Sequence, residues 1–202
     1  MGAGILPTTI YKNKLYFLFG KENQYEDSAE GFSDFGGGTD NSESFLQTAI
    51  REGGEELTGF LGSDNDVKQL LQKHGTYNID YKDLNSKFSV YRMHIFPMKY
   101  DPLLPLYYNN NQRFLQKRLD PKIIKSSKIF EKEEIRWVCV DDIMKMKPKF
   151  RSYFQNIVEM IHKQKRQIKI FIMASLKNKT YRKKSTKNKT IKKVNLDLKY
   201  KI

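Results

Sequence analysis

The first part of the chain consists of short runs rich in β-branched and aromatic residues, separated by polar turns. Residues 3–10 and 15–20 have the length and composition of two strands, and residues 11–14 between them are typical of a hairpin connection. Residues 32–35 predict another short strand, which leads into three consecutive glycines at 36–38. The N-terminal sequence therefore predicts a hairpin followed by a strand that ends in a glycine turn.

After the glycines, apolar residues recur at helical spacing. Ser42 together with Glu43 indicates the start of a helix. The side chains that would form the buried stripe of this helix are all apolar, namely Phe45, Leu46, Ala49 and Ile50. The other side of the helix carries acidic residues, so one face can be buried while the other remains available for chemistry.

The rest of the chain alternates between segments with the pattern of a helix and segments with the pattern of a strand. Residues 64–74 predict a second helix, and helical patterns also close the body of the chain at residues 141–146 and 150–165. Three further strands are predicted, over residues 77–81, 88–96 and 134–140.

Residues 100–111 contain Pro102 and Pro105, and we expect a loop there because proline lacks the backbone donor. Strands on both flanks of the acidic helix, together with terminal helices, indicate an α+β protein. The predicted architecture is an α/β/α sandwich with a mixed sheet, followed by a basic C-terminal tail.

Three carboxylates share one face of the acidic helix. Glu52, Glu55 and Glu56 fall within an arc of about 100° on a helix that advances 100° per residue. Like charges at this spacing repel one another. A divalent cation such as Mg²⁺ or Mn²⁺ would offset the repulsion, because it prefers carboxylate oxygens. A solvated acidic face with no ligand is the alternative.

The spacing of these residues resembles the Nudix box. In that motif a glycine, five residues, a glutamate and seven residues precede Arg-Glu-U-x-Glu-Glu-x-Gly-U, where U is a bulky aliphatic residue. Gly37, Glu43 and the run from Arg51 to Glu56 stand at these spacings, so the box would cover residues 37–59.

The end of the box departs from the pattern, because Gly53 stands at the first aliphatic position and Thr58-Gly59 replaces the final glycine and aliphatic residue. We expect the helix to extend by one residue, which would place Gly59 in the left-handed position at its end and Phe60 after it. A glycine inside a helix costs about 1 kcal/mol relative to alanine. Gly53 and Gly54 therefore indicate close approach to a sheet or ligand, or a weakness that other packing tolerates.

The resemblance implies a fold for most of the chain. The order of elements over about residues 1–160 is similar to the Nudix fold, and residues 133–146, EEIRWVCVDDIMKM, are similar to the family's late strand and short helix. We therefore expect a Nudix domain over residues 1–162 and a basic extension over residues 163–202.

The resemblance also implies a chemistry. Nudix proteins use divalent metal and water to hydrolyse a nucleoside diphosphate linked to another group. The ligands of Mg²⁺ or Mn²⁺ would be Glu52, Glu55, Glu56 and the backbone of Gly37, while Arg51 would orient a neighbouring glutamate. Glu43 and Gly38 would brace the turn. The base that activates water would be Glu52, or a loop glutamate among Glu131, Glu133 and Glu134, for which a solvated charged turn is the alternative.

The composition of the chain indicates where in the cell we expect the protein. A single cysteine, Cys139, cannot form an internal disulfide. No segment approaches the roughly 20 apolar residues that span a bilayer, and the N-terminal residues lack the pattern of a secretory leader. We expect an intracellular protein in the cytoplasm that does not bind a membrane, and the basic tail leaves a nuclear location open.

The formal net charge of +14 resides in the C-terminal part of the chain. Residues 163–202 contain 15 lysines and arginines against one acid, Asp197, whereas residues 1–162 are balanced at 22 of each sign. Beyond residue 177 we expect disorder, because the run has little to bury. The cations that could contact RNA phosphates are Arg182, Lys183, Lys184, Lys192 and Lys193. A solubilising tail without a partner is the alternative.

Two functions follow. The first is a metal-dependent Nudix pyrophosphohydrolase acting on a nucleotide-type substrate, for which the basic tail favours a capped or 5′-phosphorylated RNA. The second is a catalytically weak RNA-binding module that keeps the Nudix fold, and the departures at Gly53 and Thr58 motivate it. The retained glutamates favour the enzyme.

Overall fold

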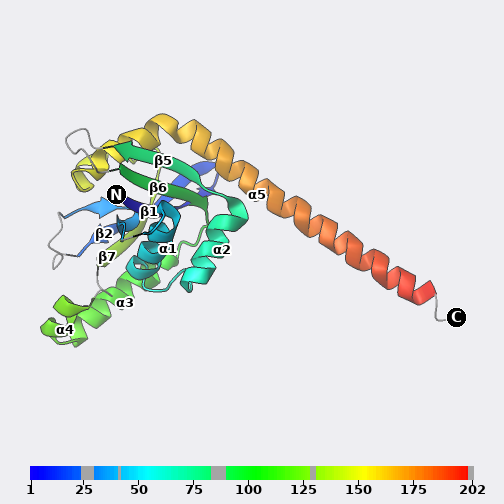
Figure 1. The fold of residues 1–202 in the computed structure, drawn as a ribbon, viewed down its shortest axis with the longest axis horizontal. Coiled ribbons are helices and arrows are strands. Elements are labelled where there is room, and N and C mark those ends of the chain that lie inside the picture. Colours follow the sequence, from blue (N-terminus) through cyan, green and yellow to red (C-terminus); the bar gives the residue numbers. More distant parts are fainter. Residues whose placement is uncertain (24–29, 41, 83–89, 128–130, 200–202) are drawn as a thin grey trace.

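The computed structural model describes residues 1–23, 30–40, 42–82, 90–127 and 131–199. Its body is a mixed sheet with helices on both faces, so the predicted α/β/α sandwich is confirmed (Figure 1). Residues 88 and 89, where one predicted strand begins, lie outside the described residues. The strands are β1 (Gly2–Tyr11), β2 (Lys14–Glu22), β3 (Phe32–Ser33), β4 (Phe35–Gly38), β5 (Tyr77–Lys82), β6 (Val90–Pro97) and β7 (Lys132–Cys139).

Strand β1 is the centre of the sheet. Its second half pairs antiparallel with β2, its first half pairs antiparallel with β4, and its other edge pairs parallel with β6. Strand β7 extends the sheet from β2, and β5 extends it from β6. The single strand predicted over residues 32–35 is divided at Asp34, because β3 pairs with β2 whereas β4 pairs with β1.

Alternation along the strands divides the core into two layers. Leu6, Phe17 and Phe19 are fully buried against the C-terminal helix, while Ile5 and Leu18 are fully buried in the layer that contains the acidic helix. Successive side chains of a strand point to opposite faces, so these neighbours belong to different cores. The sheet is therefore apolar on both faces.

The acidic helix α1 (Phe45–Glu56) begins two residues later than predicted. Ser44 caps it: the Ser44 hydroxyl accepts from the Gln47 amide, and the Gln47 side chain accepts from the Ser44 amide. This reciprocal pair satisfies two backbone donors that the helix leaves unpaired. Helix α2 (Asp64–His74) has the predicted bounds, and an equivalent box of Ser63 and Asp66 caps it.

The loop predicted over residues 100–111 is wrong. Two helices, α3 (Leu104–Arg118) and α4 (Pro121–Ser126), follow β6. Pro105 lies in the first turn of α3, where the missing donor has no intrahelical partner to lose. Tertiary contacts hold this helix, because the Asn109 side chain accepts from the Ile135 amide at 2.8 Å and donates to the Ile135 carbonyl at 3.2 Å.

The helix predicted over residues 141–146 is also wrong, because this segment forms successive turns before the short 3₁₀ helix η2 (Lys147–Lys149). These turns carry the apolar side chains of Ile143 and Phe150 into the core beneath the C-terminal helix. The amides of Asp142, Lys147 and Lys149 each donate to the carbonyl three residues earlier, which is the bonding of turns and 3₁₀ helix rather than of a regular α-helix.

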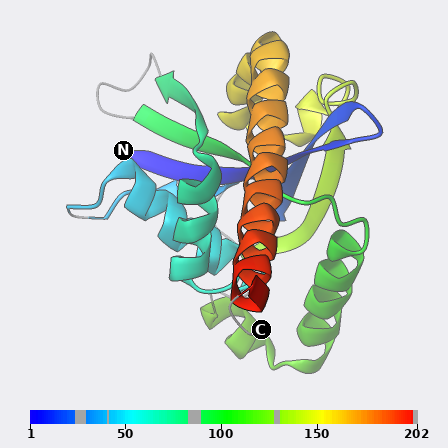
Figure 2. The same cartoon turned by 90° about the vertical axis from the view of Figure 1, so that its right-hand side faces the viewer.

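Helix α5 (Phe154–Lys199) is continuous across the predicted boundary at residue 162. Ile168 and Ile172 are fully buried in the same core as Phe154, so the folded body extends into the predicted extension. Residues 177–199, for which disorder is the expectation, continue the helix and project beyond the sheet (Figures 1 and 2). Lysine and arginine have high helix propensity and prolong an existing helix without a nucleation cost.

In the part of the chain that the structure describes, no helix combines the length and apolar character that crossing a membrane requires.

Gly53 allows α1 to approach the sheet closely. A Cβ at this position would lie 2.4 Å from Cδ1 and 2.7 Å from Cγ1 of Ile5 on β1. The side chain of Ile5 therefore fills the place of the aliphatic residue that the Nudix box has here. The close approach to a sheet that the two glycines indicate is confirmed at Gly53.

We expect Gly53→Ala to lower the free energy of unfolding by about 1–3 kcal/mol, because the overlap with Ile5 outweighs the helix propensity of alanine. Ile5→Val removes the Cδ1 atom, so the double variant Gly53→Ala/Ile5→Val should recover part of the loss. Urea unfolding of the four proteins measures the coupling. Simple additivity of the two substitutions would contradict the overlap.

Candidate active site

The turn between β4 and α1 places the glycines against the acidic helix. A Cβ on Gly37 would lie 2.6 Å from the carboxylate of Glu52, so only glycine lets this carboxylate pack against the backbone. The Gly37 carbonyl oxygen lies beside Gly2 of β1, where a Cβ would meet it at 2.8 Å. The role of that carbonyl as a metal ligand stays a prediction.

Arg51 connects the polar residues of the box. Its Nε donates to Glu43 Oε1 at 3.0 Å, and its Nη1 donates to Glu52 Oε1 at 2.8 Å. Its Nη2 donates to the carbonyl oxygen of Gly38 at 3.0 Å, and its Nη1 lies 3.5 Å from Glu55 Oε2. One guanidinium thus joins the glycine turn, the first glutamate of the box and two carboxylates of α1.

Glu43 is held on both oxygens. Its Oε2 accepts from Arg51 Nη2 at 3.1 Å, from the Thr48 hydroxyl at 2.9 Å and from the Asp40 amide at 3.2 Å. These hydrogen bonds, with Arg51 first, lower the pKa of Glu43 to about 2. Glu43 is therefore ionised at neutral pH, which suits a residue that braces the turn.

Glu56 lies apart from this half-buried cluster and is itself buried. The amide of Gly36 donates to its Oε2 at 2.7 Å, and Lys132 Nζ lies 3.0 Å from its Oε1. Burial raises the pKa of the Glu56 carboxyl well above its ordinary value, and the charge of Lys132 acts in the opposite direction. The third carboxylate of the helical face therefore already has a cation.

Lys132, on β7, is fully buried and also pairs with Glu22 at the end of β2. Its Nζ donates to the Ser33 hydroxyl at 3.0 Å, and Arg151 Nη1 lies 2.8 Å from Glu22 Oε1. Burial by itself would lower the pKa of Lys132, but the carboxylates of Glu56 and Glu22 outweigh it and raise the pKa above its ordinary value. The ammonium is therefore charged inside the protein.

The carboxylates of the site differ in how well they suit a divalent cation. Across the residues that the structure describes, no three acidic, histidine or cysteine side chains form a ready metal site. Glu52 and Glu55, however, both contact Nη1 of Arg51, so their oxygens lie close together, and their side chains are 13% and 35% exposed. Two carboxylates with access to water suit Mg²⁺ or Mn²⁺, which keep several water ligands.

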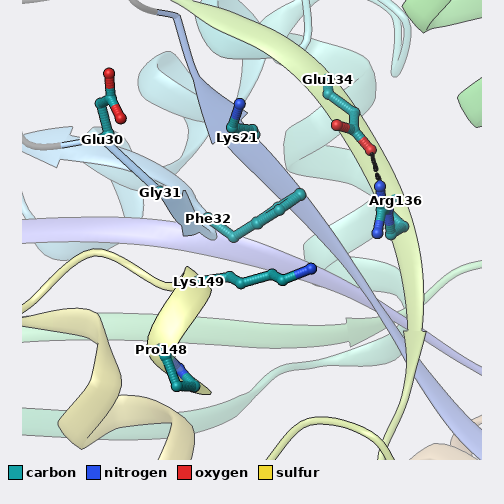
Figure 3. A pocket seen from close by; sticks show the side chains of 8 residues that line it. All are labelled: Lys21, Glu30, Gly31, Phe32, Glu134, Arg136, Pro148 and Lys149. Carbon is teal, nitrogen blue, oxygen red and sulfur yellow. Dashed lines mark hydrogen bonds and ion pairs between the residues drawn. The ribbon is translucent and has the colours of Figure 1, made fainter. Parts of the chain in front are cut away.

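Of the three loop glutamates among which a catalytic base was predicted, Glu133 and Glu134 lie on strand β7, and Glu131 directly precedes it. Glu133 is paired with Lys21, and Glu134 with Arg136, whose Nη2 lies 2.6 Å from Glu134 Oε1. Glu134 lines a hollow of about 400 Å³ together with residues of β2, β3 and η2 (Figure 3). Lys132, at the start of β7, reaches the box instead, and it lies beyond the β-bulge at which the pairing of β7 with β2 shifts register.

The helix ends at the position that the spacing of the Nudix box gives, so the predicted extension by one residue is wrong. The Thr58 amide donates to the Glu55 carbonyl at 2.9 Å and the Gly59 amide donates to the Gly54 carbonyl at 3.2 Å, which is a Schellman arrangement. Thr58 has φ +49° and occupies the position of the motif's glycine, and Gly59, with φ +74°, is left-handed as expected. A threonine in this conformation is strained.

The residues predicted to contact nucleic acid lie on the part of α5 that projects beyond the sheet (Figure 1). They are Arg182, Lys183, Lys184, Lys192 and Lys193. Figure 1 places this segment away from α1, so the structure does not bring these cations and the box together.

Three buried polar residues beside the box were missed in the sequence. In the sequence, Glu22 and Lys132 are charged residues near the ends of predicted strands, and Asp34 lies within a predicted strand. Asp34 is fully buried, and the Tyr91 hydroxyl contacts both its oxygens at 2.9 Å. The only local signal was the polar pair Ser33-Asp34 between Phe32 and Phe35.

Comparison with known proteins gives a distant structural likeness. No family model matches the sequence, and no curated protein does. The Nudix hydrolase RenU of M. smegmatis is 13% identical, with 83% of this chain and 86% of RenU covered and a TM-score of 0.48. An Ap4A hydrolase of C. elegans is 16% identical (78% and 91% covered, TM-score 0.43). The NUDIX domain of Shewanella oneidensis NrtR, complexed with ADP ribose, is 15% identical (82% and 85% covered, TM-score 0.43).

Asp34 makes stability depend on pH. Burial raises its pKa from 3.8 to about 7 in the folded protein, against the hydrogen bonds of Tyr91 and the charge of Lys132. The folded state therefore binds one proton more than the unfolded state between these values, and the free energy of unfolding falls as pH rises through them.

We expect the free energy of unfolding to fall between pH 5.5 and 8, with on the order of 2 kcal/mol of the loss due to Asp34. Asp34→Asn, which cannot ionise, should remove this part and should be relatively more stable at pH 8. Urea unfolding of both proteins at several pH values measures the difference. Parallel pH profiles would show that Asp34 does not titrate in this range.

Proposed function

We propose that this protein is a Nudix pyrophosphohydrolase that depends on a divalent metal ion. It would cleave the pyrophosphate bond of a nucleoside diphosphate linked to another group. The observation that carries the proposal is the guanidinium of Arg51, which contacts Glu43, Glu52 and Glu55 and the carbonyl of Gly38. Residues spaced as in the Nudix box therefore meet in space.

The composition of the cluster argues against a merely solvated acidic face. Two carboxylates, Glu52 and Glu55, are held side by side at the surface, and Arg51 cannot neutralise both together with Glu43. An acidic surface repels a pyrophosphate unless cations lie between them. Mg²⁺ or Mn²⁺ bound by Glu52 and Glu55 would supply that positive charge and stabilise the charge that develops on the phosphate oxygens.

The reaction is a displacement at phosphorus. A water oxygen forms a bond to one phosphorus, the bridging phosphorus–oxygen bond breaks, and its electron pair leaves with the departing phosphate. A carboxylate takes the proton of the water. Glu52 suits this role better than Glu133 and Glu134, because it lies in the cluster against Gly37 whereas the other two lie on β7 beside Lys21 and Arg136.

An RNA with a capped or phosphorylated 5′ end is the substrate that we favour. Its support is the charge of residues 163–199 of α5, which carry 14 cations against one acid on a helix that extends from a neutral body. Such a helix attracts a polyphosphate chain over more length than a small free nucleotide offers. The competing function is a Nudix-fold RNA-binding module with weak turnover, which the strain at Thr58 favours.

We expect Glu52→Gln and Glu55→Gln each to lower kcat by about 10²-fold or more, because each removes a charge used in the reaction. Matched changes at the surface of β7, Glu133→Gln and Glu134→Gln, should change kcat less than about threefold, because the two carboxylates lie outside the cluster. Product release with Mg²⁺ from capped RNA, dinucleoside polyphosphates and ADP-ribose is the assay.

Absence of turnover on every substrate by the wild-type protein would favour the binding module. If Glu134→Gln lost as much activity as Glu52→Gln, the base would instead lie on β7.

We expect replacement of Arg182, Lys183, Lys184, Lys192 and Lys193 by glutamine to weaken RNA binding and to flatten its dependence on salt concentration. The control replaces five exposed lysines of the body, namely Lys12, Lys68, Lys73, Lys122 and Lys125. Filter binding at several salt concentrations measures both quantities. Equal losses in the two variants would show that net charge, rather than the projecting helix, attracts RNA.

A further inference from the structure

Lys132 contacts Glu56 of the box but has no role in the proposed reaction. Its side chain has no exposed surface, and its ammonium lies between Glu56 on α1 and Glu22 on β2. Ser33 supplies a third oxygen, 3.0 Å from Nζ. The ammonium is therefore surrounded by three oxygen atoms from three different elements, which is the environment of a bound cation.

The position of this cation decides what Glu56 can do. Lys132 lies 3.0 Å from Oε1 of Glu56, and the Gly36 amide donates to Oε2 at 2.7 Å. Both oxygens are engaged inside the protein, and the side chain is 6% exposed against 13% and 35% for Glu52 and Glu55. A divalent cation on Glu56 would lie next to the ammonium, and the two positive charges would repel one another in a region of low dielectric.

We propose that Lys132 is a positioning residue whose ammonium occupies the cation position at Glu56. The proposal rests on the proposed function, in which Glu52 and Glu55 hold the divalent ion. A divalent ion that three carboxylates without Lys132 would bind at Glu56 is then absent. Lys132 thereby confines divalent metal to Glu52 and Glu55. Glu56 anchors the helix to β7 instead of binding metal.

A purely structural ion pair would also be buried, so stability alone cannot separate the two roles. The number of metal ions that the protein binds distinguishes a positioning residue from a purely structural one. Lys132→Met keeps an unbranched side chain that ends at Cε and removes the ammonium, which leaves the carboxylates of Glu22 and Glu56 facing one another with room for a cation. Arg151→Met is the matched control, because Arg151 pairs with Glu22 at 2.8 Å through the oxygen that also contacts Lys132.

The experiment is titration of the full-length proteins with Mn²⁺, in which electron paramagnetic resonance measures free Mn²⁺. We expect Lys132→Met to bind one Mn²⁺ more than the wild type, and Lys132→Met/Glu56→Gln to return to the wild-type number. Arg151→Met and Lys132→Arg should keep the wild-type number. In the wild-type background, Glu56→Gln should change the dissociation constant of Mn²⁺ less than about twofold, because Lys132 already excludes the ion from that carboxylate.

The proposal is overturned if Lys132→Met binds the same number of ions as the wild type, or if Glu56→Gln alone weakens Mn²⁺ binding about tenfold or more. Should Lys132→Met fail to fold, the Glu56→Gln measurement decides by itself. A wild-type protein that binds no Mn²⁺ and cleaves no pyrophosphate contradicts the proposed function. Mn²⁺ binding and turnover in the wild type, without an additional ion in Lys132→Met, contradicts only the role of Lys132.

Discussion

The close approach of helix α1 to the sheet is the constraint on which the candidate site depends. Gly53 has no side chain, so the helix can lie directly on Ile5 of β1. The same approach places Glu52 against Gly37 and brings Glu56 within 2.7 Å of the Gly36 amide. A helix displaced outward by one side chain would separate these groups, and the acidic residues would then be an ordinary solvated face.

The charges of the site form two sets with different surroundings. The partly exposed set centres on Arg51, where water reaches the carboxylates and weakens the interactions by screening. The buried set centres on Lys132, where each charge is costly unless it has a partner, and Glu22 and Glu56 provide two. The first set is the one in which the proposed chemistry would take place, and the second set attaches α1 to β7.

Local patterns predicted much of the fold where packing and propensity agreed. The hairpin of β1 and β2, the bounds of α2 and the buried stripe of α1 followed from alternation, capping and helical spacing. The pattern failed where tertiary contacts decided. Helix α3 is held by Asn109 on the backbone of Ile135, and the segment after Val140 forms turns although Ile143 and Phe150 are buried in the core.

The sequence by itself determined which carboxylates share a face of the acidic helix, the glycine turn before it and the offset between Glu43 and Arg51. Helical periodicity makes this possible, because the spacing of two residues along a helix fixes the angle between their side chains. It could not determine which cation each carboxylate meets. Glu56 and Lys132 are far apart in the chain, as are Glu22 and Arg151, and nothing local relates them. Only the pairing of β7 with β2 and the position of α1 on the sheet bring these charges together, because a buried charge is stable only where the fold supplies its partner.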